Sequence, residues 1–267
     1  MGKIKFSFFI CLFAALIACS TVPLTGRKQF SLVGDDEINT SAAQSYKQLL
    51  TDPKTKVISG TRDAESVKRV GNRLATAIEG YLKANGYGDQ YSFQWEFTLI
   101  QSQEVNAWCM PGGKVAVYSG ILPITMDDAG LATVMGHEIG HAIARHSAER
   151  ISQQRAAQAG GALVGIASSD QSQLTQGIIN QLYGVGGQLV LLKYSRNQES
   201  EADRLGLIFM ALAGYDPNNA VAFWQRMAAQ NKGGAPPEFL STHPADETRI
   251  QAIKGHVPEA MKYYRHQ

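Results

Sequence analysis

The sequence predicts an α+β fold that is mostly helical and contains one small antiparallel sheet. Apolar residues recur at helical spacing over most of the 267 residues. One stretch, Tyr91–Leu99, alternates between apolar and polar residues, as a strand with one buried face does. Two short apolar segments flank Pro111, Gly112 and Gly113, which is typical of a hairpin with a wide turn.

The first 18 residues have the build of a secretory signal. Lys3 and Lys5 precede an unbroken apolar run from Phe8 to Ala18. A membrane-spanning helix needs about 20 apolar residues, and this run has about half that number. We therefore expect residues 1–18 to be a signal peptide.

The run ends in the sequence "LIAC", which resembles the lipobox of bacterial lipoproteins. This resemblance implies that Cys19 becomes the lipidated first residue of the mature chain. Ser20 after it implies the outer membrane, with the protein facing the periplasm. The alternative is an ordinary cleaved signal in which Cys19 has no role. Residues 19–34 are polar and rich in turn residues, so we expect a lipidated tether before a folded domain at 35–267.

Composition excludes two classes of protein. Without residues 1–18 the chain has 23 basic and 23 acidic residues, so no strong positive field attracts nucleic acid. Cys109 is then the one cysteine besides Cys19, which excludes a disulfide framework.

The first helices are expected from Asp35 and from Asp63. The second ends at the exit signal "NGYG". Its apolar residues fall on one face: Val67, Val70, Leu74, Ile78 and Leu82.

Everything from Asp127 or Asp128 onward reads as helical, and either aspartate is placed to cap the start. The apolar runs within 156–190 are too short to span a membrane, so we expect a helical hairpin there. A later helix is capped by Asp216, and the last one ends at Gly255.

The sequence "GHEIGHAIARHS" carries the main chemical signal. His137 and His141 are four residues apart, so on a helix both imidazoles reach the same point. A metal ion held by both imidazoles can bind a water molecule, and Glu138 lies close enough to act on that water. In such an H-E-x-x-H motif zinc lowers the pKa of the water and the glutamate accepts its proton. Small residues form a stripe that lets another element approach: Gly136, Gly140 and Ala144.

A third ligand is expected from "SRNQESEADRLG", where Glu199 and Asp203 share a helix face and Glu201 lies about 200° from Glu199. Asp203 is placed to accept from the outer nitrogen of a metal-bound histidine. On a continuous helix His146 points about 140° away from His141. We therefore expect His146 to be a surface or packing residue.

Four segments together resemble the HtpX-like and CAAX-prenyl-protease-like zinc metallopeptidases of peptidase family M48, in particular their soluble lipoprotein branch. They are "NAWCMPGGKVAVYSGIL", "GHEIGHAIARHSAER", "SRNQESEADRLG" and "STHPADETRI", and the similarity covers about residues 30–255. The resemblance implies a gluzincin fold and one Zn²⁺ per chain on His137, His141 and Glu199. It also implies that Glu138 is the general base. The spanning helices of the membrane-embedded members are missing, so prenyl-peptide processing is not implied.

The same resemblance implies that the hairpin supplies a sheet edge beside the active-site helix. An edge strand can bind an extended peptide through its backbone. The candidate substrate-binding residues are Asn106, Ala107, Trp108, Gly112 and Gly113. Core packing and a turn are the alternative roles for Trp108 and Asn106.

Three further residues are singled out. His243 in "STHP" is held extended before a proline, and it either stabilises the oxyanion or occupies the open metal position. Arg196 is placed to pair with Glu199 or Asp203. Cys109 is expected to be a small buried hydrophobe.

These observations predict a lipid-anchored zinc endopeptidase of the bacterial envelope. Its expected substrates are unfolded or misassembled envelope proteins, because an edge strand binds extended chain, and outer-membrane assembly proteins are candidate partners. One alternative is a chaperone-like or latent lipoprotein that binds clients in the same groove. Another is a structural zinc site closed by His243 or Cys109.

Overall fold

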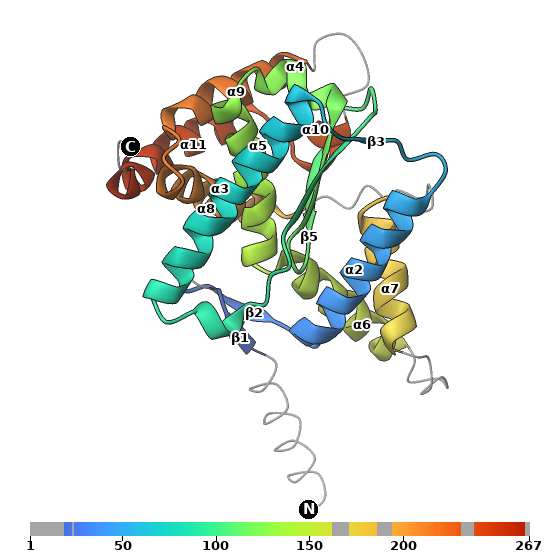
Figure 1. The fold of residues 1–267 in the computed structure, drawn as a ribbon. Coiled ribbons are helices and arrows are strands. Elements are labelled where there is room, and N and C mark those ends of the chain that lie inside the picture. The colour runs from blue at the N-terminus through green and yellow to red at the C-terminus, as the bar shows by residue number, and fades with distance from the viewer. Residues whose placement is uncertain (1–18, 23, 162–170, 186–193, 231–237, 265–267) are drawn as a thin grey trace, which may run out of the picture.

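In the computed structural model, a four-stranded sheet stands between two groups of helices (Figure 1). The structure describes residues 19–22, 24–161, 171–185, 194–230 and 238–264. The helices are α2 (Asp35–Thr51), α3 (Arg62–Ala84), α4 (Leu122–Thr125), α5 (Asp128–Ile143), α6 (His146–Gly161), α7 (Gln171–Leu182), α8 (Arg196–Leu212), α9 (Asn218–Ala229), α10 (Glu238–Thr242) and α11 (Glu247–Ala260). The predicted mostly helical α+β fold is confirmed.

The larger sheet is mixed. Its strands are β3 (Val57–Ile58), β4 (Glu96–Ile100), β5 (Ala107–Met110) and β6 (Lys114–Tyr118), in the order β3-β4-β6-β5. The predicted hairpin exists, since β5 and β6 are antiparallel. However, β4 pairs with β6 in parallel, so the expectation of a purely antiparallel sheet was wrong in this pair. A parallel pair needs a long connection, and the connection between β4 and β6 contains β5.

Helices cover both faces of the sheet, which explains why β5 and most of β6 are buried. Alternate residues of the strands belong to two different cores. Cys109, Val115 and Val117 face the core formed with α3, α5 and α8. Trp108 and Met110 face the smaller core formed with α2 and α7. In Figure 1 the sheet is seen nearly edge-on between these two groups.

The predicted strand over Tyr91–Leu99 is shorter than expected, because β4 begins only at Glu96. Residues 91–95 belong to no strand, and Gln94 N–H donates to the carbonyl of Gly112 in the hairpin turn. The alternation nevertheless placed four rings on one side, where neighbours stack with centroids 4.4–5.9 Å apart. The four rings are Tyr91, Phe93, Trp95 and Phe97.

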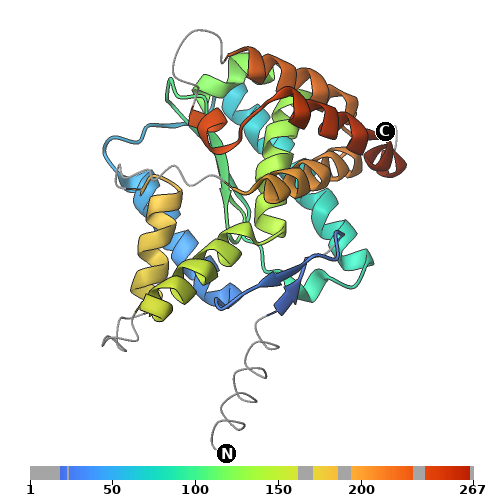
Figure 2. The same cartoon turned by 180° about the vertical axis from the view of Figure 1, so that it is seen from behind.

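Residues 19–34 are not a free tether. Strands β1 (Cys19–Thr21) and β2 (Lys28–Phe30) form an antiparallel hairpin (Figure 2). Val22 is buried in the main core, and Leu32 N–H donates to the Ser152 hydroxyl of α6. The folded domain therefore begins before the predicted boundary at residue 35. The predicted signal peptide, residues 1–18, lies outside the described residues.

The helix boundaries follow the capping signals at most positions. Asp127 caps α5 by accepting from Gly130 N–H, as predicted. The last helix does not end at Gly255 but runs to Ala260 with Pro258 inside it. The predicted hairpin over 156–190 appears as parts of α6 and α7, with residues 162–170 and 186–193 outside the description. None of the helices described is long and apolar enough to cross a membrane.

Candidate metal centre

The site is built where α5 and α8 cross in backbone contact. A Cβ atom added at Gly140 would lie 2.8 Å from the carbonyl oxygen of Ala202. A Cβ added at Gly206 would lie 2.9 Å from the backbone nitrogen of His137. Only glycine permits these approaches, so the stripe of small residues has the role that its spacing predicted. The contact places the first turns of α8 against the histidines of α5.

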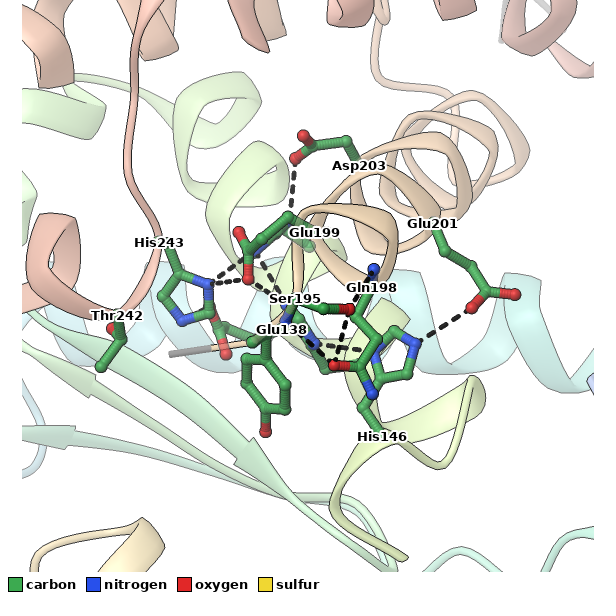
Figure 3. A network of polar contacts seen from close by, with 12 residues as sticks. Glu138, His146, Ser195, Gln198, Glu199, Glu201, Asp203, Thr242 and His243 are labelled. Carbon is green, nitrogen blue, oxygen red and sulfur yellow. Dashed lines mark hydrogen bonds and ion pairs between the residues drawn. The ribbon is translucent and has the colours of Figure 1, made fainter. Parts of the chain in front are cut away.

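Four buried side chains meet at this crossing: His137, His141, Glu199 and His243. Their candidate ligand atoms all lie within 4.8 Å of one another. The Nε2 atoms of His137 and His141 are 3.1 Å apart, and His243 Nδ1 is 2.9 Å from Glu199 Oε1. Figure 3 shows His243 and Glu199 pointing toward each other. The structure thus brings together the three predicted ligands and adds His243 as a fourth donor.

The outer nitrogen of His137 lies next to a carboxylate, as expected for a metal ligand. His137 Nδ1 lies 2.9 Å from Asp203 Oδ1, the contact predicted from the spacing of Glu199 and Asp203 on one helix face. A proton on Nδ1 leaves the Nε2 lone pair free. That lone pair faces the corresponding atom of His141 in a buried site, an arrangement that a bound cation stabilises.

Burial and neighbouring charges act in opposite directions on the protonation states of the cluster. Burial lowers the pKa of His137 and lowers that of His141 well below its ordinary value, so both rings are neutral. Burial opposes ionisation of Glu199, but His243 and His141 hold its pKa well below the ordinary value. The cluster therefore offers two neutral imidazoles and one carboxylate, the donor set that catalytic zinc commonly takes.

Glu138 lies beside the cluster and not within it. Its Oε1 atom is 3.6 Å from His243 Nε2. Burial raises the pKa of Glu138 to about 7, although His243 acts in the opposite direction. A carboxylate with that pKa can both accept and return a proton near neutral pH.

An arginine that the sequence did not single out holds the two acidic groups of α8. Arg249 of α11 places Nη1 3.0 Å from Glu199 Oε2 and Nη2 2.8 Å from Asp203 Oδ1. Its guanidinium also lies over the Trp224 ring, 3.7 Å from the centroid. Arg196, predicted for this position, is instead exposed on the first turn of α8. The spacing of residues in the sequence could not predict Arg249, because its side chain reaches the site only through the packing of α11 on α8.

His146 and Glu201 contact each other outside the donor cluster. Of the two roles expected for His146, surface and packing, the structure shows the packing role: His146 is fully buried, and its Nδ1 lies 2.8 Å from His141 Nδ1. Its Nε2 lies 3.0 Å from Glu201 Oε2, and Figure 3 shows Glu201 pointing toward His146 and away from the donor cluster. Glu201 is thus outside the cluster, as its helical position predicted. Burial raises its pKa, but hydrogen bonds from His146, Thr25 and Arg27 lower it to about 2.

Cys109 is the buried hydrophobe that was expected. It is 3% exposed, and burial raises the pKa of its thiol well above the ordinary value. It is outside the four-residue donor cluster, so closure of the site by a thiolate is not what this structure shows.

The predicted substrate-binding residues divide into edge and core. Strand β5 is at the sheet edge and packs against α5, as expected. The Trp108 side chain is only 6% exposed and contacts Tyr46 and Tyr183, so it belongs to the core. The Asn106 side chain accepts from Ala107 N–H.

The two glycines of the hairpin turn have positive φ, 77° at Gly112 and 86° at Gly113. Gly113 also leaves room for the Trp95 ring, which an added Cβ would meet at 2.7 Å. The structure thus explains both glycines by the turn itself. Along the edge, the carbonyl of Cys109 accepts from Tyr183 Oη at 3.3 Å.

Comparisons with known proteins agree with this geometry. The profile of peptidase family M48 matches residues 62–257. The mitochondrial metalloendopeptidase OMA1 of Schizosaccharomyces pombe is 34% identical over 90% of this chain and 67% of its own length. The metalloprotease YcaL of Escherichia coli is 28% identical over 90% of this chain and 95% of its own length.

A third relative is the putative beta-barrel assembly-enhancing protease of Vibrio cholerae, 36% identical over 70% of this chain and 37% of its own length. The chain spans about half or less of several relatives, such as 49% of OMA1 from Saccharomyces cerevisiae. The matched residues include the whole of α5 and α8 with their donor cluster. The chain therefore belongs to peptidase family M48 and is a metallopeptidase.

Proposed function

We propose that this protein is a zinc-dependent endopeptidase that cleaves unfolded or misassembled proteins of the cell envelope. The observation that carries the proposal is the buried donor set of His137, His141 and Glu199 with Glu138 directly beside it. Bound zinc supplies Lewis-acid polarisation of the scissile carbonyl and of water. Zinc is favoured because two imidazoles and one carboxylate suit it, and the family match requires a metal of some kind.

Glu138 is the proposed general base. It accepts the proton of the attacking water and passes it to the leaving amine. Asp203 and Arg249 are proposed to fix the orientation of His137 and Glu199, because Asp203 contacts His137 at 2.9 Å and Arg249 contacts Glu199 at 3.0 Å and Asp203 at 2.8 Å. Arg249 also balances two carboxylates that are buried within one helical turn of each other.

His243 supports a second candidate state, a latent form of the same enzyme. Its Nδ1 atom lies 3.2 Å from His137 Nε2 and 2.9 Å from Glu199 Oε1, within the donor set itself. A histidine in that place takes a fourth ligand position and competes with substrate. When it withdraws, its ring can donate to the oxyanion, so the two roles predicted for His243 belong to two states.

Substrate class follows from the edge strand. We propose that extended chain pairs with the backbone of β5 near Ala107, because this edge lies against the active-site helix. Backbone pairing involves few side chains of the substrate, so the cleavage preference is broad. The names of the bacterial relatives, two of which are beta-barrel assembly-enhancing proteases, support misassembled outer-membrane proteins as a substrate and partner class.

Location is proposed from the leader and not from the family, since several relatives are mitochondrial. The leader sequence ending in Cys19 supports a lipoprotein anchored in the outer membrane and facing the periplasm. Metabolic labelling with a radioactive fatty acid tests this: the wild-type protein takes up label, and a Cys19→Ser variant does not. Equal labelling of both proteins contradicts the anchor.

The catalytic proposal is tested by the Glu138→Gln substitution. The variant should keep its zinc content and fold but lose about 10²–10⁴-fold of the cleavage rate on unfolded casein. Glu65→Gln on the exposed face of α3 is the control and should retain activity. A Glu138→Gln variant that still cleaves casein contradicts the base assignment. Zinc binding without cleavage by the wild-type protein favours the chaperone-like or latent alternative.

The latent state is tested with a cobalt-substituted protein and a hydroxamate inhibitor. His243→Ala should show an immediate change of the cobalt spectrum when hydroxamate is added, because a ligand position is free. The wild-type spectrum should change only at higher hydroxamate concentration. Identical titrations of the two proteins contradict occupation of the fourth position by His243.

A further inference from the structure

The two candidate histidine ligands have different outer partners. His137 reaches a carboxylate directly, through the 2.9 Å contact with Asp203. His141 instead reaches a second imidazole, since its Nδ1 atom lies 2.8 Å from His146 Nδ1. His146 is fully buried and its other nitrogen lies 3.0 Å from Glu201 Oε2. An imidazole, that of His146, thus lies between His141 and its carboxylate Glu201, whereas His137 contacts Asp203 directly.

Only one arrangement of protons satisfies this chain. If His141 offers the lone pair of Nε2 to a metal, its proton is on Nδ1 and points at His146 Nδ1. His146 Nδ1 must then accept, so the proton of the neutral His146 ring is on Nε2. Nε2–H donates to the Glu201 carboxylate, which can only accept when ionised. Every hydrogen bond therefore runs from the ligand toward Glu201.

The far end of the chain is held by the amino-terminal hairpin. Between β1 and β2, the Thr25 hydroxyl donates to Glu201 Oε1 at 2.5 Å, and Arg27 Nε donates to Glu201 Oε2 at 2.6 Å. The side chain of Glu201 is only 7% exposed, so these donors replace water around the charge. Arg27 also contacts Glu149 of α6, which keeps the guanidinium in place.

We propose that His146, Glu201 and Arg27 form a positioning relay for His141, a conclusion that rests on the proposed metal site. The relay fixes the ring of His141 and makes it a stronger donor through the negative charge of Glu201. It also makes the metal site depend on the hairpin at residues 19–30, the segment next to the proposed anchor. Each histidine ligand is then supported by one carboxylate and one arginine: Asp203 and Arg249 for His137, Glu201 and Arg27 for His141.

The experiment measures zinc affinity by competition with a chelator. Loss of an outer partner typically costs about 10–100-fold in metal affinity. Glu201→Gln keeps the shape of the side chain and removes its charge, so we expect a loss in that range. Arg27→Met acts three hydrogen bonds from the metal, and we expect a loss of about tenfold. Arg27→Lys restores a positive charge and should recover most of the affinity.

A matched control separates the relay from general destabilisation. Arg204 of α8 pairs with Glu259 at 2.6 Å, a similar ion pair on the same helix outside the donor cluster. Arg204→Met should leave zinc affinity unchanged, even where the thermal unfolding of the metal-free protein shifts as much as in Arg27→Met. Nitrogen NMR of the imidazoles should show protons on Nδ1 of His141 and on Nε2 of His146.

Three results overturn the relay: unchanged zinc affinity in Glu201→Gln and Arg27→Met, an equal loss in Arg204→Met, or the opposite tautomer of His146. Failure of the proposed metal site looks different, because the wild-type protein itself then binds no zinc. Failure of the proposed catalysis alone shows as zinc binding by the wild-type protein without cleavage of casein.

Discussion

The Gly140→Ala substitution examines the feature on which the site depends most, the backbone contact of α5 with α8. The added Cβ would lie 2.8 Å from the Ala202 carbonyl oxygen, about 0.6 Å inside ordinary van der Waals contact. This oxygen is main chain, so α8 must move as a whole. Overpacking of this kind costs about 1–3 kcal/mol, and the gain in helix propensity returns up to about 1 kcal/mol. We expect a net destabilisation of about 1–2 kcal/mol.

The same shift displaces Glu199 and Asp203, which flank Ala202 on α8. We therefore expect weaker zinc binding together with the lower stability, measured by chelator competition and by urea unfolding of the metal-free protein. Gly80→Ala is the control, because a Cβ at this exposed helical position meets nothing within 4 Å. It should stabilise the protein by about 0.4–1 kcal/mol without changing zinc affinity. If Gly140→Ala behaves like Gly80→Ala, the close contact of the two helices is refuted.

Three further outcomes are expected. Arg249→Met leaves the buried Glu199 and Asp203 carboxylates without their counter-charge, so thermal unfolding of the metal-free protein should show a loss of about 3–5 kcal/mol. The loss should be smaller with zinc, and equal losses would contradict the shared site. Tyr183→Phe removes the hydroxyl that donates to the Cys109 carbonyl on the β5 edge. The free carbonyl should raise casein cleavage, and the lost hydrogen bond should cost about 1 kcal/mol of stability. Lower cleavage contradicts edge binding. Zinc at 1,000 times its Kd should stabilise the protein by about 4.1 kcal/mol, reversed by chelator, and an unchanged melting temperature speaks against a metal site.

The spacing of apolar residues was sufficient to predict those elements in which buried residues recur at a regular interval. The five apolar positions from Val67 to Leu82 are all buried in α3, because one face of a long helix packs on the core. The alternation from Tyr91 to Leu99 identified the side on which the rings lie but not the strand itself. Strand assignment requires a partner, and residues before Glu96 bond to the hairpin turn and not to a neighbouring strand. The parallel pairing of β4 with β6 likewise depends on the order of strands, which no single segment encodes.

The site shows the same limit. His137, His141, Glu199 and Asp203 could be found because two helices each present them at helical spacing, and small residues indicated that the helices touch. Arg249 could not be found this way, since it comes from a third helix whose approach depends on the packing of α11 against α8. A buried pair of carboxylates does predict that some cation lies near it. Only the fold selects Arg249 over Arg196.

His146 is outside the donor cluster as predicted, but the geometry assumed for it was wrong. The angle of about 140° from His141 assumes one continuous helix. In the structure α5 ends at Ile143, and Arg145 adopts a left-handed φ of 55° before α6 begins at His146. This break turns the chain, and the Nδ1 atom of His146 lies 2.8 Å from that of His141. A non-glycine residue in that region costs about 1–3 kcal/mol, and Arg145 is held there by Asp35 at 2.6 Å and by the ring of Tyr91. The break thus places the His146 imidazole next to the proposed metal ligand His141, within 3.0 Å of the Glu201 carboxylate of α8.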